Sequence, residues 1–248
     1  MLENITEGAS NVTLSMLAPP TTGCLHDYQL TTRDMKNIED CDILVANGLG
    51  MEDFIDKVMD IKKDSTIIAG EGYPAVNDNA HIWVSPEGAI YEVEQIAEGL
   101  ECLDKDNADI YQRNAEAYIA RLESLAQEMH EKLDKYEGTK VITFHEAFPY
   151  FASEFKLDTV AVIERDAGTE PSAKELNDIV KLIKQVQSEE GRIALFAEPQ
   201  YSSDAAKVIS DETGLEVGEL DPAVTGSLDK DSYINAMKNN IKVLEELL

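Results

Sequence analysis

Short apolar runs rich in β-branched residues alternate along the chain with longer stretches of helical periodicity. Most runs do not alternate between apolar and polar residues, which is typical of parallel strands covered on both faces. We predict strands at Val12–Leu17, Asp42–Ala46, Ser65–Ala69, Lys140–Phe144, Thr159–Ile163, Arg192–Phe196 and Glu216–Leu220. Helices are predicted at Thr32–Glu39, Glu52–Met59, Pro86–Leu100, Ser172–Glu189, Ser202–Thr213 and Asp231–Leu247. This alternation predicts an α/β fold with parallel sheets.

One helical stretch is longer than the others. Between Asp106 and Tyr136 there is no strong helix breaker, and apolar residues recur at close to 3.6-residue intervals. A helix of that length would extend about 46 Å, which is more than an ordinary crossover between two strands needs. We therefore predict two βα lobes joined by a long rigid helix. The predicted parts are an N-terminal lobe at 1–104, a linking helix at 105–137 and a C-terminal lobe at 138–248.

The start of the chain is unusual for such a lobe, which normally opens with a strand. Here Leu2–Ile5 has the pattern of a helix end, and the predicted strand Val12–Leu17 follows directly. We expect an opening strand and part of its helix to be missing from the N-terminal lobe. The first residues also lack the basic and apolar regions of a signal peptide.

The charge balance is strongly acidic. The 248 residues include 49 Asp and Glu against 21 Lys and Arg, a net charge of −28. Such a surface repels phosphate backbones and anionic membranes, so a nucleic-acid partner is not expected. It attracts cations, although solubility alone also explains the acidity. The three cysteines, at positions 24, 41 and 102, form no C-x-x-C motif, so they indicate neither a disulfide framework nor a thiolate zinc site.

The four histidines differ in their predicted positions. His26 lies in a loop after the first predicted strand, and His145 directly follows the predicted strand Lys140–Phe144. His81 precedes a predicted helix, whereas His130 lies within the long helix among charged residues. Functional groups of open parallel sheets gather at the carboxyl ends of the strands. His26, His81 and His145 are therefore candidates for one site, although any single histidine is more often a structural residue.

Three imidazoles and one carboxylate would complete a tetrahedral Zn²⁺ site. Asp221 is the best placed carboxylate because it directly follows the predicted strand Glu216–Leu220, although Asp-Pro also commonly starts a turn. Cys24 is a candidate soft ligand or simply a small buried residue. Glu198 could orient a ligand or form an ion pair.

Several catalytic patterns are absent. His145 and Glu146 begin an H-E-x-x-H motif, but Pro149 stands where the second histidine would be. The sequence contains neither a G-x-S-x-G elbow nor a P-loop. Two alternatives to a metal receptor remain. One is a zinc hydrolase that uses the three candidate histidines, with Glu146 or Asp221 as general base. The other is an acidic docking module that holds metal only structurally.

Six segments of the chain resemble one known family. They are GCLHDYQLTTRD at 23–34, DILVANGLGMEDF at 42–54, AHIWVSP at 80–86, VITFHEAFPYF at 141–151, FAEPQ at 196–200 and ELDP at 219–222. Together they resemble the cluster A-I substrate-binding proteins of ABC transporters, which bind zinc or manganese. The resemblance covers nearly the whole chain, and its motifs are specific in combination.

This resemblance implies a metal site between the two lobes, with His26 and His81 from the first lobe and His145 and Asp221 from the second. It implies a monomeric extracytoplasmic receptor, periplasmic or at the cell surface and lipid-anchored in its full-length form. Such a receptor is not an enzyme; it captures a divalent metal and delivers it to a membrane permease.

The expected metal is Zn²⁺, with Mn²⁺ as the alternative. Manganese receptors of this family often have a second carboxylate in place of one histidine, and position 145 here is histidine. Nitrogen ligands also favour Zn²⁺ over Mn²⁺. The stretch Gly72–Asn79 is short and contains no histidine, so a metal-gathering loop is not expected.

Overall fold

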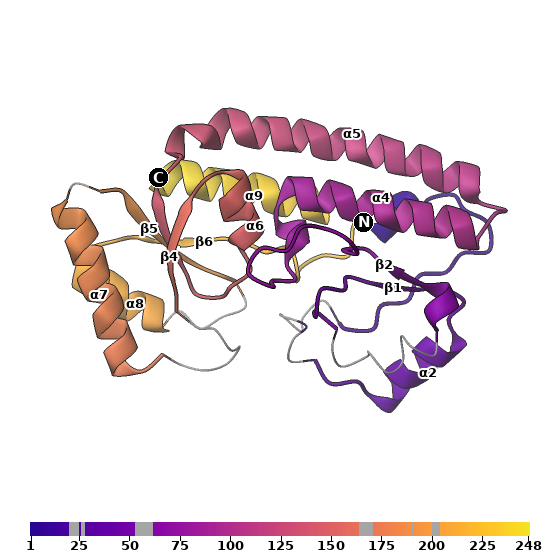
Figure 1. The fold of residues 1–248 in the computed structure, drawn as a ribbon, viewed down its shortest axis with the longest axis horizontal. Helices are drawn as coiled ribbons and strands as arrows, with labels where there is room; N and C mark the ends of the chain where they lie inside the picture. The colour runs from indigo at the N-terminus through magenta and orange to yellow at the C-terminus, as the bar shows by residue number, and fades with distance from the viewer. Residues whose placement is uncertain (20–24, 26–27, 53–61, 164–170, 190, 200–203) are drawn as a thin grey trace.

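Two parallel sheets lie beneath a layer of long helices in the computed structural model (Figure 1). The structure describes residues 1–19, 25, 28–52, 62–163, 171–189, 191–199 and 204–248. The strands are β1 (Leu44–Ala46), β2 (Thr66–Ile68), β3 (Lys140–Thr143), β4 (Asp158–Val162), β5 (Ile193–Ala197) and β6 (Val217–Glu219). The α-helices are α1 (Leu2–Ile5), α2 (Thr32–Asp40), α4 (Pro86–Leu103), α5 (Ala108–Leu133), α6 (Pro149–Glu154), α7 (Ala173–Ser188), α8 (Asp204–Thr213) and α9 (Ser232–Leu247). Short 3₁₀ helices are η3 (Lys63–Ser65), η4 (Ile82–Val84) and η5 (Asp134–Tyr136).

Both sheets are parallel, as the alternating pattern predicts. Strands β1 and β2 pair in the first sheet, and the second has the order β4-β3-β5-β6. Six of the seven predicted strands are confirmed, with ends that shift by one or two residues. The helix predicted from Ser172 is confirmed as α7, and Ser172 and Glu175 form a capping box at its start: each side chain accepts a hydrogen bond from the other residue's backbone N–H.

The seventh predicted strand, Val12–Leu17, is wrong. These residues form no strand, and the side chains of Leu14 and Met16 are exposed. The run is anchored instead at its ends, since Val12 packs against the main core and Leu17 against the small cluster of Ile38 and Leu44. A strand needs a neighbour to satisfy its backbone, and in the described part of the chain β1 and β2 pair only with each other.

The helix predicted at Glu52–Met59 lies outside the described residues from position 53 onward. Glu52 itself is buried and closes the loop after β1. Its carboxylate oxygens accept the backbone N–H groups of Asn47 and Gly48 at 2.7 and 2.9 Å. Because one charged carboxylate accepts both hydrogen bonds, Glu52 stabilises this loop.

The predicted long helix is confirmed as α5, which starts at Ala108 and continues into η5 as far as Tyr136. Gly138, with φ of 77°, follows the end of this helix. Figure 1 shows α5 running above both sheets, with α4 and α9 beside it. The buried face of this helix includes Tyr111, Ala115, Tyr118 and Leu122.

A single apolar core joins the two halves of the chain. It contains Ile67 and Val84 from the first half, Leu122 from α5, and Phe196 and Leu220 from the second half. The predicted lobe boundaries at residues 104 and 137 stay a prediction. A second core lies between the larger sheet and helices α7 and α8. None of the described helices is both long enough and apolar enough to cross a lipid bilayer.

The first residues pack against late parts of the chain. The Asn4 side-chain amide donates to the carbonyl of Lys230 at 2.9 Å, across 226 residues of sequence. Asn114 on α5 donates to the carbonyls of Ile5 and Glu7 at 3.0 and 2.8 Å. Ile5 is completely buried in the shared core. The chain start is therefore held by α5 and by the segment just before α9.

Candidate metal site

His145 emerges from the carboxyl end of the larger sheet. The residue before it, Phe144, donates its backbone N–H to the carbonyl of Phe196 at 3.2 Å, which extends the pairing of β3 with β5. Helix α6 begins at Pro149, so His145 lies in the short turn between strand and helix. Its side chain is 3 % exposed. The predicted position at a strand end is confirmed, although the sequence analysis missed α6.

His81 lies directly before η4, which packs closely against the start of α4. The His81 side chain is 1 % exposed. The Ser85 hydroxyl accepts the backbone N–H of Gly88 at 3.0 Å and caps α4. A Cβ at Gly88 would lie 2.0 Å from the carbonyl oxygen of Ile82, so only glycine lets α4 begin this close to η4. This close approach sets the position of the backbone that carries His81.

The two histidine rings lie side by side. Their centroids are 5.2 Å apart, and their planes meet at 84°. With Zn–N bonds of about 2.1 Å, two imidazoles on one tetrahedral Zn²⁺ would have ring centroids about 5 Å apart. The observed separation therefore fits two ligands of one metal ion. The structure thus brings together two of the four predicted ligands, one from each half of the chain.

The loops on either side of this histidine pair are bonded to each other. The Asn79 side-chain amide donates to the carbonyl of Glu146 at 2.7 Å. The Tyr150 hydroxyl donates to the carbonyl of Asn79 at 2.7 Å and accepts the backbone N–H of Val76 at 3.2 Å. Sequence reasoning missed Asn79 and Tyr150. The only signal for Asn79 was its place two residues before His81, in a polar run that reads as a turn.

Asp221 follows β6, and its loop is tied to that of His81. The indole N–H of Trp83 donates to the carbonyl of Pro222 at 2.8 Å. Asn240 on α9 fixes the Asp221 backbone through two hydrogen bonds of 2.8 Å. Burial raises the pKa of the Asp221 carboxyl, and a hydrogen bond from the backbone N–H of Ala223 lowers it in part. This environment favours a nearby cation as a partner for the carboxylate.

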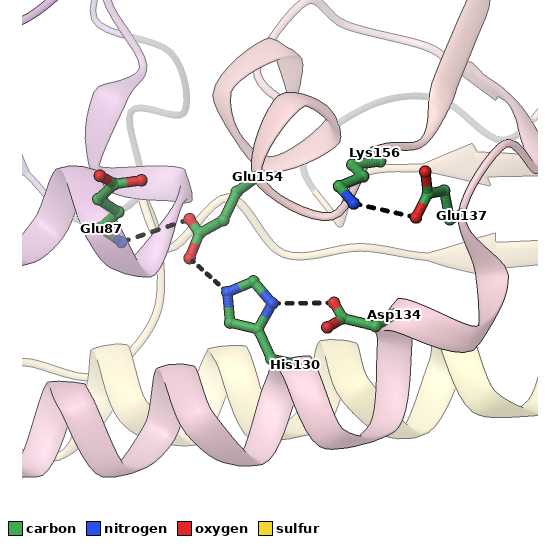
Figure 2. A network of polar contacts seen from close by, with 6 residues as sticks. All are labelled: Glu87, His130, Asp134, Glu137, Glu154 and Lys156. Carbon is green, nitrogen blue, oxygen red and sulfur yellow. Dashed lines mark hydrogen bonds and ion pairs between the residues drawn. The ribbon is translucent and has the colours of Figure 1, made fainter.

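A network of polar side chains contacts the start of α4 (Figure 2). Glu154, at the end of α6, accepts the backbone N–H of Glu87 at 3.3 Å. Its carboxylate lies 3.5 Å from Nε2 of His130, whose Nδ1 lies 2.9 Å from Asp134. Burial raises the pKa of Glu154, and the bond from Glu87 lowers it in part. His130 therefore links α5 to α6 and α4 and takes no part in the histidine pair.

The remaining candidates are only partly placed. His26 and Cys24 lie outside the described residues. Within the residues that the structure describes, no three His, Cys, Asp or Glu side chains form a group able to hold a metal ion. The Glu146 side chain is exposed, whereas Glu198 is buried just after β5. The complete set of His26, His81, His145 and Asp221 thus stays a prediction.

The sequence matches a protein-family model described as "Zinc-uptake complex component A periplasmic" over residues 1–247. The chain is 29 % identical to the zinc-binding lipoprotein AdcA of Streptococcus pneumoniae, over 89 % of this chain and 48 % of that protein. It therefore spans about half the length of that relative. It is 25 % identical to the manganese-binding lipoprotein MntA of Halalkalibacterium halodurans, over 97 % of this chain and 82 % of that protein.

Solved structures have the same fold. The substrate-binding protein FpvC of Pseudomonas aeruginosa in complex with Mn²⁺ superposes with a TM-score of 0.84 at 29 % identity, covering 99 % of this chain and 92 % of that one. The Zn(II)-bound AdcA of Streptococcus pneumoniae superposes with a TM-score of 0.82 at 27 % identity, covering 99 % of this chain and 54 % of that one. These matches agree with the parallel sheets and long helix described above.

Proposed function

Because the chain belongs to the family of periplasmic zinc-uptake components, we propose that it captures one divalent metal ion outside the cytoplasm and delivers it to an ABC importer. The metal would be held by coordination alone, with no chemical change. The proposed ligands are His26 and His81 from the first half of the chain, and His145 and Asp221 from the second. The acidic net charge of −28 would draw cations toward the protein.

The histidine pair carries this proposal. His81 and His145 are buried, come from different halves of the chain, and have rings whose separation suits a shared tetrahedral metal. Asp221 supports it, since its loop is bonded to Trp83 and its carboxyl is partly removed from water. Metal binding between segments that are distant in sequence suits a receptor, which must hold and later release its cargo.

Zn²⁺ is the proposed cargo. Imidazole and carboxylate ligands suit a tetrahedral zinc site, and nitrogen ligands bind Zn²⁺ more tightly than Mn²⁺. The relatives include both zinc-binding and manganese-binding lipoproteins, so Mn²⁺ is the competing cargo to test. We further propose that the full-length protein is a lipid-anchored monomer that has no nucleic-acid partner.

The hydrolase alternative is not supported. The family and its relatives are metal-binding uptake components rather than enzymes. Glu146, one of the two general bases that this alternative offers, has an exposed side chain beside the buried His145. A fourth ligand from Asp221 would also leave no coordination position for an activated water.

Calorimetric titration of metal-stripped protein with Zn²⁺, repeated in the presence of excess Mn²⁺, tests the proposal. We expect one tight zinc site per chain that Mn²⁺ does not displace. Replacing His81, His145 or Asp221 by alanine should weaken zinc binding by more than about 100-fold, beyond the usual effect of losing an outer partner. His130→Gln removes a histidine outside the pair and serves as the matched control, with zinc affinity unchanged.

Three outcomes would contradict the proposal. The first is a folded wild-type chain that binds no zinc. The second is zinc affinity that survives both His81→Ala and His145→Ala, since the metal would then be held elsewhere. The third is an equal loss of zinc affinity in His130→Gln, which would indicate a general loss of structure rather than the loss of a ligand.

A further inference from the structure

The Asn79 side chain is buried, and both ends of its amide are engaged by backbone groups. Its Oδ1 accepts the backbone N–H of His81 at 2.9 Å, and its Nδ2 donates to the backbone carbonyl of Glu146 at 2.7 Å. A backbone N–H can only donate and a carbonyl can only accept. These two bonds therefore identify the oxygen and the nitrogen of the amide without ambiguity.

This orientation decides where the proton of the His81 ring lies. Nδ1 of His81 is 3.0 Å from the same Oδ1 of Asn79. An amide oxygen has no hydrogen, so Nδ1 must be the donor in this bond. A neutral imidazole has one ring N–H. The lone pair needed to coordinate a metal is therefore on Nε2 of His81.

The other end of Asn79 reaches the second histidine. Glu146 is the residue directly after His145, so the Asn79 amide bridges the two loops that carry the paired rings. Tyr150 on α6 holds the backbone of Asn79 through its hydroxyl at 2.7 Å. Three atoms of Asn79 therefore make these hydrogen bonds. Oδ1 bonds to His81 within the same loop, whereas Nδ2 and the backbone carbonyl oxygen bond to the second half of the chain.

We propose that Asn79 is a positioning residue for metal capture, which fixes His81 in the Nδ1–H tautomer and holds the His81 and His145 loops together. This inference rests on the proposed function. Partners of this kind orient a metal-binding histidine and raise its basicity, and their loss typically costs about 10–100-fold in metal affinity. Asn79 would thereby set the direction from which Nε2 of His81 approaches the metal ion.

Two variants separate the two roles of the amide. Asn79→Ala removes both the acceptor for the His81 ring and the donor to Glu146. Asn79→Asp keeps an oxygen acceptor for His81 but cannot donate to the Glu146 carbonyl. Long-range ¹H–¹⁵N NMR spectra of the metal-free proteins show which ring nitrogen of His81 carries the proton. Titration with Zn²⁺ alone measures the affinity of the same samples.

For wild type we expect a single Nδ1–H tautomer at His81. In Asn79→Ala the Nε2–H tautomer should appear, and zinc affinity should fall by about 10–100-fold. Asn79→Asp should keep the Nδ1–H tautomer. A merely structural role for Asn79 would not shift the ring proton. If Asn79→Ala fails to fold, an Nε2–H tautomer in Asn79→Asp contradicts the inference on its own.

Failure of this inference differs from failure of the proposed function. A wild-type chain that binds no zinc overturns the proposed function, and with it any role of Asn79 in metal capture. A wild-type chain that binds zinc, with Asn79→Ala keeping both the Nδ1–H tautomer and the wild-type affinity, overturns the role of Asn79 alone.

Discussion

The indole N–H of Trp83 donates to the carbonyl of Pro222 at 2.8 Å, although 139 residues separate the two in sequence. Trp83 lies two residues after His81, and Pro222 lies directly after Asp221. The Tyr233 hydroxyl on α9 in turn donates to the carbonyl of Trp83 at 2.8 Å. Through this chain of bonds, the segments that carry two of the proposed ligands are held together.

Trp83→Phe keeps an aromatic ring but removes the donor to Pro222. We expect the free energy of unfolding to fall by about 1–2 kcal/mol, as for the loss of a partly buried hydrogen bond. Zinc affinity should fall several-fold, because the Asp221 loop loses its tie. Urea unfolding of metal-free protein and zinc titration check these two effects. Tyr91→Phe removes a hydroxyl bond to the Glu71 carbonyl away from the pair and should leave zinc affinity unchanged.

The buried carboxyl of Glu92 on α4 should make the free energy of unfolding depend on pH. Burial, with a contribution from Glu52, raises its pKa to about 8. The folded chain therefore keeps this proton at pH values where the unfolded chain has lost it. Stability is then full below the ordinary carboxyl pKa of 4.5 and decreases as pH rises toward about 8.

Glu92→Gln removes this titration. In urea unfolding at pH 8 the variant should be more stable than wild type by at least about 1 kcal/mol, and this advantage should disappear at pH 4. Glu94→Gln, on the exposed side of the same helix, is the control and should leave the pH dependence as in wild type. Equal pH dependence of wild type and Glu92→Gln would contradict the prediction.

Glu154 and Glu137 offer a matched comparison within one network (Figure 2). Glu154→Ala removes the acceptor for the first turn of α4 and the partner of His130. We expect it to lower the free energy of unfolding by about 1–3 kcal/mol, because the mostly buried Glu154 carboxylate contacts two other helices. Glu137→Ala breaks only an exposed ion pair with Lys156 and should cost less than about 1 kcal/mol. Similar unfolding midpoints for the two variants would contradict this view of the network.

Much of the fold could be predicted because its signals are local. Unalternating apolar runs marked six strands, and the Ser172–Glu175 capping box marked the start of α7. Val12–Leu17 has the same apolar character, yet a strand also requires a neighbour, which composition cannot supply. Helix α6 was missed for a similar reason. It has only six residues, too few to show a helical period, and it is stabilised by packing against the rest of the protein.

Local patterns predicted where His145 lies, but they could not predict the contacts that position the candidate site residues. The position of His145 followed from the rule that functional groups gather where parallel strands end. The close approach of His81 to His145 depends on contacts between distant segments, such as that of Asn79 with Glu146, which no local pattern encodes. Asn79 and Trp83 were therefore missed as positioning groups. His26 lies outside the described residues, so its predicted role was not tested.

The contacts made by the first residues also bear on when the chain can fold. Ile5, α4 and α5 share their core with Tyr233, Met237 and Leu244 of α9, and Asn4 is bonded to Lys230. The first half of the sequence thus has core partners in α9, which is synthesised much later. Contacts between residues so distant in sequence make folding slow, because the chain loses the entropy of loop closure before these contacts stabilise it. A nascent chain that has not yet reached α9 would leave apolar faces of α4 and α5 exposed, so this core can close only after α9 has been synthesised.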